Sequence, residues 1–84
     1  MEIKYHSAIK KDLSKISPAN RQRIKSSIEN KLTKNPVIFS QPLRYTLRNY
    51  RKLRVGNYRI VFRIQKSVLL VLAIKHRSEI YKKF

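Results

Sequence analysis

The dipeptide Gly56-Asn57 constrains the fold most, because it contains the only glycine of the chain and lies between two alternating runs of residues. Gly-Asn in such a setting is typical of a two-residue hairpin turn of type II′. The length of the turn also fixes the strand register. It predicts that Arg54 lies opposite Arg59 and that Tyr50 lies opposite Arg63.

Side chains alternate along a strand, so the two faces of this predicted hairpin differ in chemistry. One face is apolar and suited to a core; it contains Leu53, Val55, Tyr58, Ile60, Phe62 and Ile64. The other face is mainly cationic and contains Tyr50, Lys52, Arg54, Arg59, Val61 and Arg63. Opposed cations destabilise a strand pair by up to about 1 kcal/mol. A solvated edge strand that discourages aggregation explains one or two charges, whereas four favour a polyanionic partner.

The segments before the hairpin predict a strand followed by two helices. Alternation indicates a strand over residues 1–6, and Ser7 is expected to cap a helix whose apolar positions are 9, 13 and 16. Ser17-Pro18 predicts the start of a second helix, which ends near Lys34 because Asn35-Pro36 cannot continue it. Residues 35–49 show no regular period and are expected to form an irregular connection.

The segment after the hairpin predicts the centre of the sheet. Residues 65–67 read as a turn, and Val68–Ile74 is apolar on both faces, as in a strand covered on both sides. We therefore expect one α+β domain over residues 1–84. It has an N-terminal strand and a two-helix hairpin packed on one face of a mainly antiparallel sheet of about four strands.

The formal net charge of +17 indicates which partners the chain attracts: RNA, DNA, an acidic protein or an anionic membrane surface. There is no cysteine, which excludes disulfides, thiol catalysis and cysteine-based zinc sites. His6 and His76 are too far apart in sequence for metal-ligand spacing, and no metal or cofactor is expected. The N-terminus has no apolar signal region, and the run 68–74 is too short to span a bilayer. We expect a cytoplasmic protein with no membrane partner.

The residues after the last strand are expected to complete one cationic concavity. Lys75, His76 and Arg77 would join the cations of the hairpin, and Tyr81 would fold back over them. Scattered carboxylates argue against glycosidase and two-metal chemistry, and a single glycine excludes a Gly-rich phosphate loop. The remaining groups suit RNA cleavage by transesterification, in which the 2′-OH attacks the adjacent phosphorus and fixed cations stabilise the transition state.

Two residues of this cluster have more than one interpretation. His76 is either an acid or base, since its unperturbed pKa lies near neutrality, or a structural histidine at a strand end. Tyr81 either stacks on a base or packs over the edge of the core.

Four segments resemble the RelE/ParE toxin superfamily of toxin–antitoxin systems: Leu43-Arg44, 52–62 (KLRVGNYRIVF), 71–74 (VLAI) and 76–81 (HRSEIY). The resemblance implies a microbial-RNase-like fold. In the RelE branch it implies mRNA cleavage in the ribosomal A site, and in the ParE branch inhibition of DNA gyrase. The chain departs from the family's pattern at two positions. Tyr45 stands where a glycine is frequent, and Lys75 stands where RelE toxins have an arginine.

The resemblance also implies catalytic residues and partners. Carried over by motif, the catalytic residues are Lys52, Arg54, Arg59, Arg77 and Tyr81, and we add His76, which matches a histidine that other RNase branches use near this end. The expected RNA-binding residues are Arg44, Arg48, Arg51, Arg63, Lys75, Lys82 and Lys83. The C-terminal tyrosine favours a RelE-like endoribonuclease, with mRNA, the ribosome and a cognate acidic antitoxin as partners. A ParE-like gyrase inhibitor and a simple nucleic-acid-binding module remain the alternatives.

Overall fold

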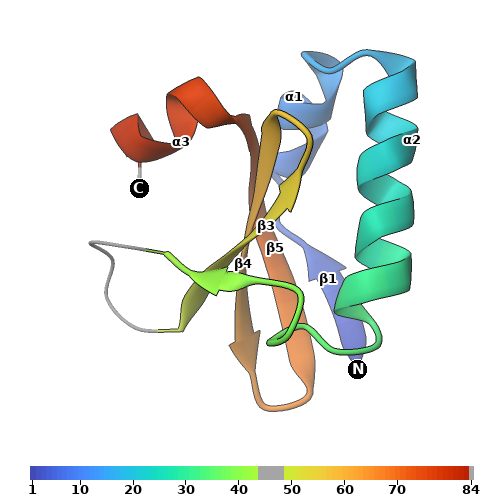
Figure 1. The fold of residues 1–84 in the computed structure, drawn as a ribbon, viewed down its shortest axis with the longest axis vertical. Coiled ribbons are helices and arrows are strands. Elements are labelled where there is room, and N and C mark those ends of the chain that lie inside the picture. The colour runs from blue at the N-terminus through green and yellow to red at the C-terminus, as the bar shows by residue number, and fades with distance from the viewer. Residues whose placement is uncertain (44–48, 84) are drawn as a thin grey trace.

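The computed structural model describes residues 1–43 and 49–83, with side chains through Ile80. The chain folds into one sheet with helices on both sides (Figure 1). In chain order the elements are β1 (Glu2–Tyr5), α1 (Ile9–Ser14), α2 (Pro18–Ser27), the π-helical segment η1 (Ile28–Leu32), β2 (Gln41–Pro42), β3 (Tyr50–Val55), β4 (Tyr58–Gln65), β5 (Val68–His76) and α3 (Arg77–Lys83).

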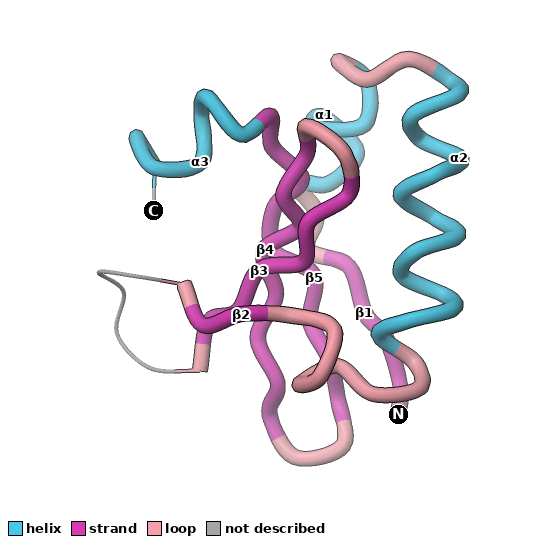
Figure 2. The backbone as a smooth tube through the Cα atoms, in the orientation of Figure 1, coloured by secondary structure: helices cyan, strands magenta, loops and turns pink. Residues whose placement is uncertain are grey.

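The strands are arranged in the order β1-β5-β4-β3-β2. β1 is parallel to β5, and every other neighbouring pair is antiparallel. Figure 2 shows the strands in magenta and the helices in cyan. The α+β class, the order of the first elements and the central place of Val68–Ile74 are confirmed. Two elements were not predicted from the sequence: the two-residue strand β2, which raises the strand number to five, and the helix α3.

The start of each N-terminal helix follows from a local hydrogen bond. Ser17 caps α2 as expected, since its hydroxyl accepts the backbone N–H of Asn20 at 3.4 Å. The expected cap at Ser7 is wrong, because α1 begins one residue later, with Ala8 at the N-cap. Nδ1 of His6 accepts the N–H of Ala8 at 3.0 Å, which fixes the turn before the helix, and no side-chain hydrogen bond caps α1.

The main core lies between the sheet and the pair α1 and α2. It contains the expected stripe of the second helix, Ile24, Ile28 and Leu32, together with the apolar face of the hairpin. A second, smaller cluster lies on the opposite face of the sheet, where Ile80 of α3 packs with Val61, Ala73 and Leu43. The two clusters show why α3 folds: it covers apolar side chains that the two N-terminal helices do not reach.

The β3–β4 hairpin has the predicted register, with Arg54 opposite Arg59 and Tyr50 opposite Arg63. Gly56 has φ = +57°, and Asn57 is not among the described residues with positive φ. This combination is that of a type II′ turn, as predicted.

The β4–β5 pairing is interrupted by a β-bulge. Phe62 pairs with Val71 whereas Val61 pairs with Ala73, which leaves Leu72 as an extra residue in β5. A bulge of one residue moves every following side chain to the other face of the sheet. Ile74 therefore reaches the main core, where an uninterrupted alternation would have placed Ala73.

Candidate functional site

The cationic face of the hairpin is present in the structure and lies on the α3 side of the sheet. We call it the basic face and define it by Lys52, Arg54, Arg59 and Arg63. Tyr50 belongs to the same face and packs on the small cluster beneath it. The guanidinium carbon of Arg63 lies 6.0 Å from the centre of the Tyr50 ring, which is within the range of a cation–π contact.

Arg59 is the most strongly fixed cation of the basic face. Only 7% of the residue is exposed. Its Nη1 donates to the backbone oxygens of Gly56 at 3.0 Å and Tyr58 at 2.9 Å, so the guanidinium braces the hairpin turn. Arg54, its partner in the register, is exposed. The face thus combines one immobilised cation with one that solvent reaches.

Lys75 lies opposite Arg59 in the β4–β5 register, so the bulge brings it toward the basic face. Its ammonium group is bound by Asp12 of α1, with Nζ 2.5 Å from Oδ1. The other carboxylate oxygen of Asp12 accepts the N–H of Ile74 at 3.0 Å. Asp12 was not among the expected site residues. The pattern of a single aspartate in a helix gives no signal for such a contact with a strand sixty residues away.

Arg77 stands at the junction between β5 and the hairpin turn. Its N–H donates to the backbone oxygen of Asn57 at 2.7 Å, and the residue itself is exposed. α3 begins here and lies against the face of the sheet that carries the small cluster, where its residue Ile80 is fully buried. Tyr81 follows Ile80 in this helix.

His76 does not join the basic face. It pairs with Tyr58, whose side chain packs on the main core, and the two rings meet edge to face with their centres 5.7 Å apart. Its Nδ1 accepts the N–H of Ser78 at 3.2 Å and lies 2.9 Å from the Ser78 hydroxyl oxygen. The expected concavity with His76 is therefore wrong. The bulge at Leu72 is the reason, since without it His76 would lie on the other face.

Arg51 is also placed elsewhere, on the core face of β3 and opposite Phe62. Its Nε donates to the Ser40 hydroxyl at 2.7 Å, and its Nη2 donates to the backbone oxygens of Val37 and Ser40, both at 3.1 Å. These bonds attach the preceding loop to the sheet, so the structure does not bring Arg51 to the other cations.

The remaining expected residues have side chains outside the described part of the structure. Arg44 and Arg48 lie outside the described residues, and so do the side chains of Tyr81, Lys82 and Lys83. Within the described part of the chain, no group of three or more histidine, cysteine, aspartate or glutamate side chains is placed to hold a metal ion. No helix in those same ranges has both the length and the apolar character needed to cross a bilayer.

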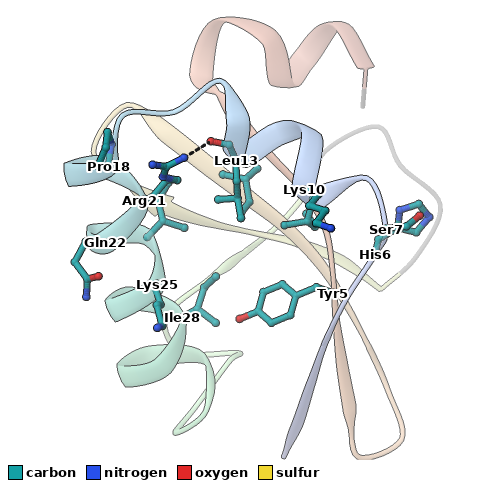
Figure 3. A pocket seen from close by; sticks show the side chains of 13 residues that line it. Tyr5, His6, Ser7, Lys10, Leu13, Pro18, Arg21, Gln22, Lys25 and Ile28 are labelled. Carbon is teal, nitrogen blue, oxygen red and sulfur yellow. Dashed lines mark hydrogen bonds between the residues drawn. The ribbon is translucent and has the colours of Figure 1, made fainter.

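A groove of about 650 Å³ lies on the opposite side of the molecule, between α1, α2 and β1 (Figure 3). Its apolar lining includes Ile9, Leu13 and Ile28, and the ring of Tyr5 points across it toward α2. The polar residues of its lining are mainly basic: His6, Lys10, Arg21 and Lys25. The sequence did not predict the groove, because the spacing of three and four between apolar residues on both helices is that of ordinary core-facing helices.

The phenol of Tyr5 is only partly buried in this groove, since 51% of the residue is exposed. This partial burial raises the pKa of Tyr5 above 10.0, and the negative charge of Glu29 raises it further.

Comparison with protein families gives a match over nearly the whole chain. The family model of the ParE toxin of type II toxin–antitoxin systems (parDE) matches residues 3–81. The chain is also 25% identical over 83 residues to Toxin RelG of Mycobacterium tuberculosis, and this alignment covers 96% of the chain and 95% of that protein.

Solved structures share the fold. A chain of the RelBE2 toxin–antitoxin complex from Mycobacterium tuberculosis has a TM-score of 0.81 at 24% identity, covering 90% of this chain and 96% of that one. A chain of the RelB–RelE antitoxin–toxin complex from Methanococcus jannaschii has a TM-score of 0.78 at 27% identity, covering 96% and 98%. The observed sheet and helices therefore match those of RelE-type toxins.

Proposed function

The chain belongs to the ParE toxin family of type II toxin–antitoxin systems, within the RelE/ParE superfamily, and from that premise we propose that it is an endoribonuclease that cleaves mRNA on the ribosome. The observation that supports this proposal best is the basic face. Arg54 and Arg59 lie opposite each other on it, and Arg77 is attached to the turn that joins their strands.

The proposed reaction needs positioning and charge from the protein. The 2′-OH of the substrate attacks the adjacent phosphorus and expels the 5′ oxygen of the next nucleotide, so the nucleophile comes from the RNA itself. Arg59 is held before the substrate arrives, which is the condition under which a cation stabilises developing charge most effectively. Lys52, Arg54 and Arg77 add charge around it, and Tyr81 is the proposed group for stacking or proton transfer.

His76 has no place in this proposal as an acid or base. Its Nδ1 is engaged at the start of α3, and its ring lies against Tyr58 on the core side of the sheet. We assign it the structural role that the sequence left open. It holds the first turn of the helix that carries Tyr81.

The cognate antitoxin is the proposed protein partner. The groove between α1 and α2 combines an apolar lining with a basic surround, which suits a segment with apolar residues on one side and acidic residues on the other. A chain of net charge +17 is expected to attract such an acidic segment at long range.

Gyrase inhibition is the second candidate, because the matching family model describes a ParE toxin. The two candidates differ in what is damaged inside the cell. A gyrase inhibitor causes DNA breaks and leaves transcripts whole, whereas an mRNA endoribonuclease cuts transcripts and leaves DNA whole.

The deciding experiment is brief induction of the toxin followed by mapping of mRNA 5′ ends by primer extension. New ends inside coding regions are expected with the parent chain. They should be lost or much reduced with Arg54→Ala, whose side chain is exposed and can be removed without disturbing the fold. Lys66→Ala, in the exposed β4–β5 turn, is the control that removes one charge away from the basic face. Whole transcripts together with a DNA-damage response would show that gyrase is the target.

Arg59→Ala is less suited to this test, although Arg59 is among the expected catalytic residues. Because its guanidinium holds two backbone oxygens of the hairpin turn, we expect this variant to lose stability as well as activity. Its folding must be checked before a loss of cleavage is attributed to chemistry.

A further inference from the structure

The loop before β2 exposes three consecutive apolar side chains. Val37, Ile38 and Phe39 are 55%, 73% and 44% exposed, respectively. We call these three residues the apolar loop. Among the described residues the other exposed large apolar side chains are Met1 and Tyr5, so this loop is where such surface is concentrated. Contiguous exposed apolar residues are a typical mark of a protein-binding surface.

The apolar loop is held in one conformation by a dense set of hydrogen bonds. Arg51 donates to the backbone oxygens of Val37 and Ser40 and to the Ser40 hydroxyl. The side-chain oxygen of Asn35 accepts the N–H of Ile38 at 3.1 Å. A surface that is ordered before binding loses less conformational entropy when a partner arrives. Arg51 therefore presents these side chains rather than burying them.

The charges around the apolar loop are positive. Nζ of Lys31 lies 6.0 Å from the centre of the Phe39 ring, and Lys34 stands three residues before Val37. The chain has no acidic residue between Glu29 and Glu79. A partner that complements this surface must carry apolar side chains together with carboxylates.

These features favour one occupant over two others. Branched aliphatic side chains such as Val37 and Ile38 neither stack on bases nor form hydrogen bonds, so they do not fit RNA. A second copy of the chain would bring another +17 of charge against the same surface. We propose that the apolar loop binds an acidic, apolar segment of the cognate antitoxin, at a site separate from the groove between α1 and α2.

This inference rests on the antitoxin partner of the proposed function and does not depend on mRNA cleavage. The test uses the antitoxin encoded with this toxin, purified separately, and three variants of the full chain. Ile38→Asp and Ile38→Lys remove the same apolar side chain and introduce opposite charges. Gln65→Asp places the same negative charge at an exposed position at the end of β4. Thermal unfolding followed by circular dichroism verifies that each variant folds.

An acidic partner predicts an order among these variants. We expect Ile38→Asp to raise the Kd of the antitoxin about tenfold or more, as the loss of a central apolar anchor does. Ile38→Lys should raise it less, because its ammonium attracts the partner's carboxylates, and Gln65→Asp should leave it unchanged. In cells, the antitoxin should no longer neutralise Ile38→Asp, while growth arrest by this variant without antitoxin is retained.

Several results would overturn the inference. Unchanged antitoxin binding by Ile38→Asp removes the site, and Ile38→Lys binding no better than Ile38→Asp removes the acidic partner. Loss of toxicity with normal antitoxin binding would assign the loop to the cellular target. A parent chain that sediments as a dimer and an Ile38→Asp variant that sediments as a monomer would assign it to self-association.

The failure of this inference can be distinguished from the failure of the nuclease proposal. If transcripts stay whole while Ile38→Asp still escapes neutralisation, the nuclease proposal fails and this inference stands.

Discussion

The ammonium nitrogen of Lys75 lies 2.5 Å from Oδ1 of Asp12, and the two side chains are 12% and 5% exposed, respectively. This ion pair joins α1 to the end of β5. β1 pairs with β5 only as far as Val71, and Asp12 continues along that edge by accepting the N–H of Ile74. The carboxylate thus takes the place of a strand at the point where the sheet would otherwise be open.

Removal of this carboxylate should be costly. We expect Asp12→Ala to lower the free energy of unfolding by about 3 kcal/mol, because Lys75 would be left as a nearly buried cation and the Ile74 N–H would lose its acceptor. The double variant Asp12→Asn/Lys75→Met removes both charges and keeps an oxygen for Ile74, so it should lose only about 1 kcal/mol. Urea unfolding measures both values. Equal losses in the two variants would mean that the charges do not interact appreciably.

Substitutions at the positive-φ residues of the two hairpin turns should change the stability of the chain in opposite directions. Gly56 has φ = +57°, and a Cβ there would lie 3.3 Å from Nη2 of Arg23, at the far end of a flexible side chain. Backbone strain therefore dominates, and Gly56→Ala should destabilise the chain by about 1–2 kcal/mol. Lys66 also has φ = +57°. Lys66→Gly relieves that strain at some entropic cost and should stabilise the chain by roughly 0.5 kcal/mol. Thermal unfolding of the two variants side by side tests whether the signs differ.

Substitutions of His76 distinguish a capping role of this residue from a catalytic role. Because its Nδ1 accepts the N–H of Ser78 just after the start of α3, His76→Ala should lower the free energy of unfolding by about 1 kcal/mol. His76→Asn should restore most of this stability, since asparagine is a good capping residue, and should cleave mRNA as the parent chain does. An asparagine variant that is stable but inactive would show that the imidazole takes part in the chemistry.

Tyr5 predicts a dependence of stability on alkaline pH. Its pKa is raised above 10.0 first by burial and then by Glu29, so the folded chain holds this proton more tightly than the unfolded chain does. The resulting stability is fully present below pH 10.0 and is lost as the pH rises through the pKa of the folded state. Tyrosine absorbance should show one late-titrating group that is absent in Tyr5→Phe. In Glu29→Gln the same group should titrate earlier.

The sequence predicted the hairpin correctly because a two-residue turn leaves no freedom in the pairing of its strands. Gly56 and the alternation around it were sufficient to place Arg54 opposite Arg59. The second turn has the same φ at its first residue, Lys66, but no glycine to indicate it. The register of β4 with β5 was correspondingly harder to predict.

The face of the sheet on which each residue after Leu72 lies could not be predicted, because nothing local in the sequence indicates the extra residue at Leu72. A strand with aliphatic residues at successive positions offers no alternation from which its faces can be distinguished. The role of Asp12 was equally hidden, since its partners Ile74 and Lys75 belong to the other end of the chain. Arg51 could not be distinguished from the cations of the basic face, because its partners Val37 and Ser40 belong to an irregular loop.

The bulge at Leu72 gives β5 two different phases within nine residues. Leu69 and Val71 meet the helices in the first phase, and Ile74 meets them in the second. Loss of one codon at this point would remove the extra residue and leave Ile74, Lys75 and His76 on the faces that they now occupy, because their pairing with β4 would be kept. The full strand without the bulge would instead send Ile74 and His76 to the side of α3 and Lys75 toward the core. The extra residue therefore decides that an ammonium rather than an imidazole lies beside Arg59.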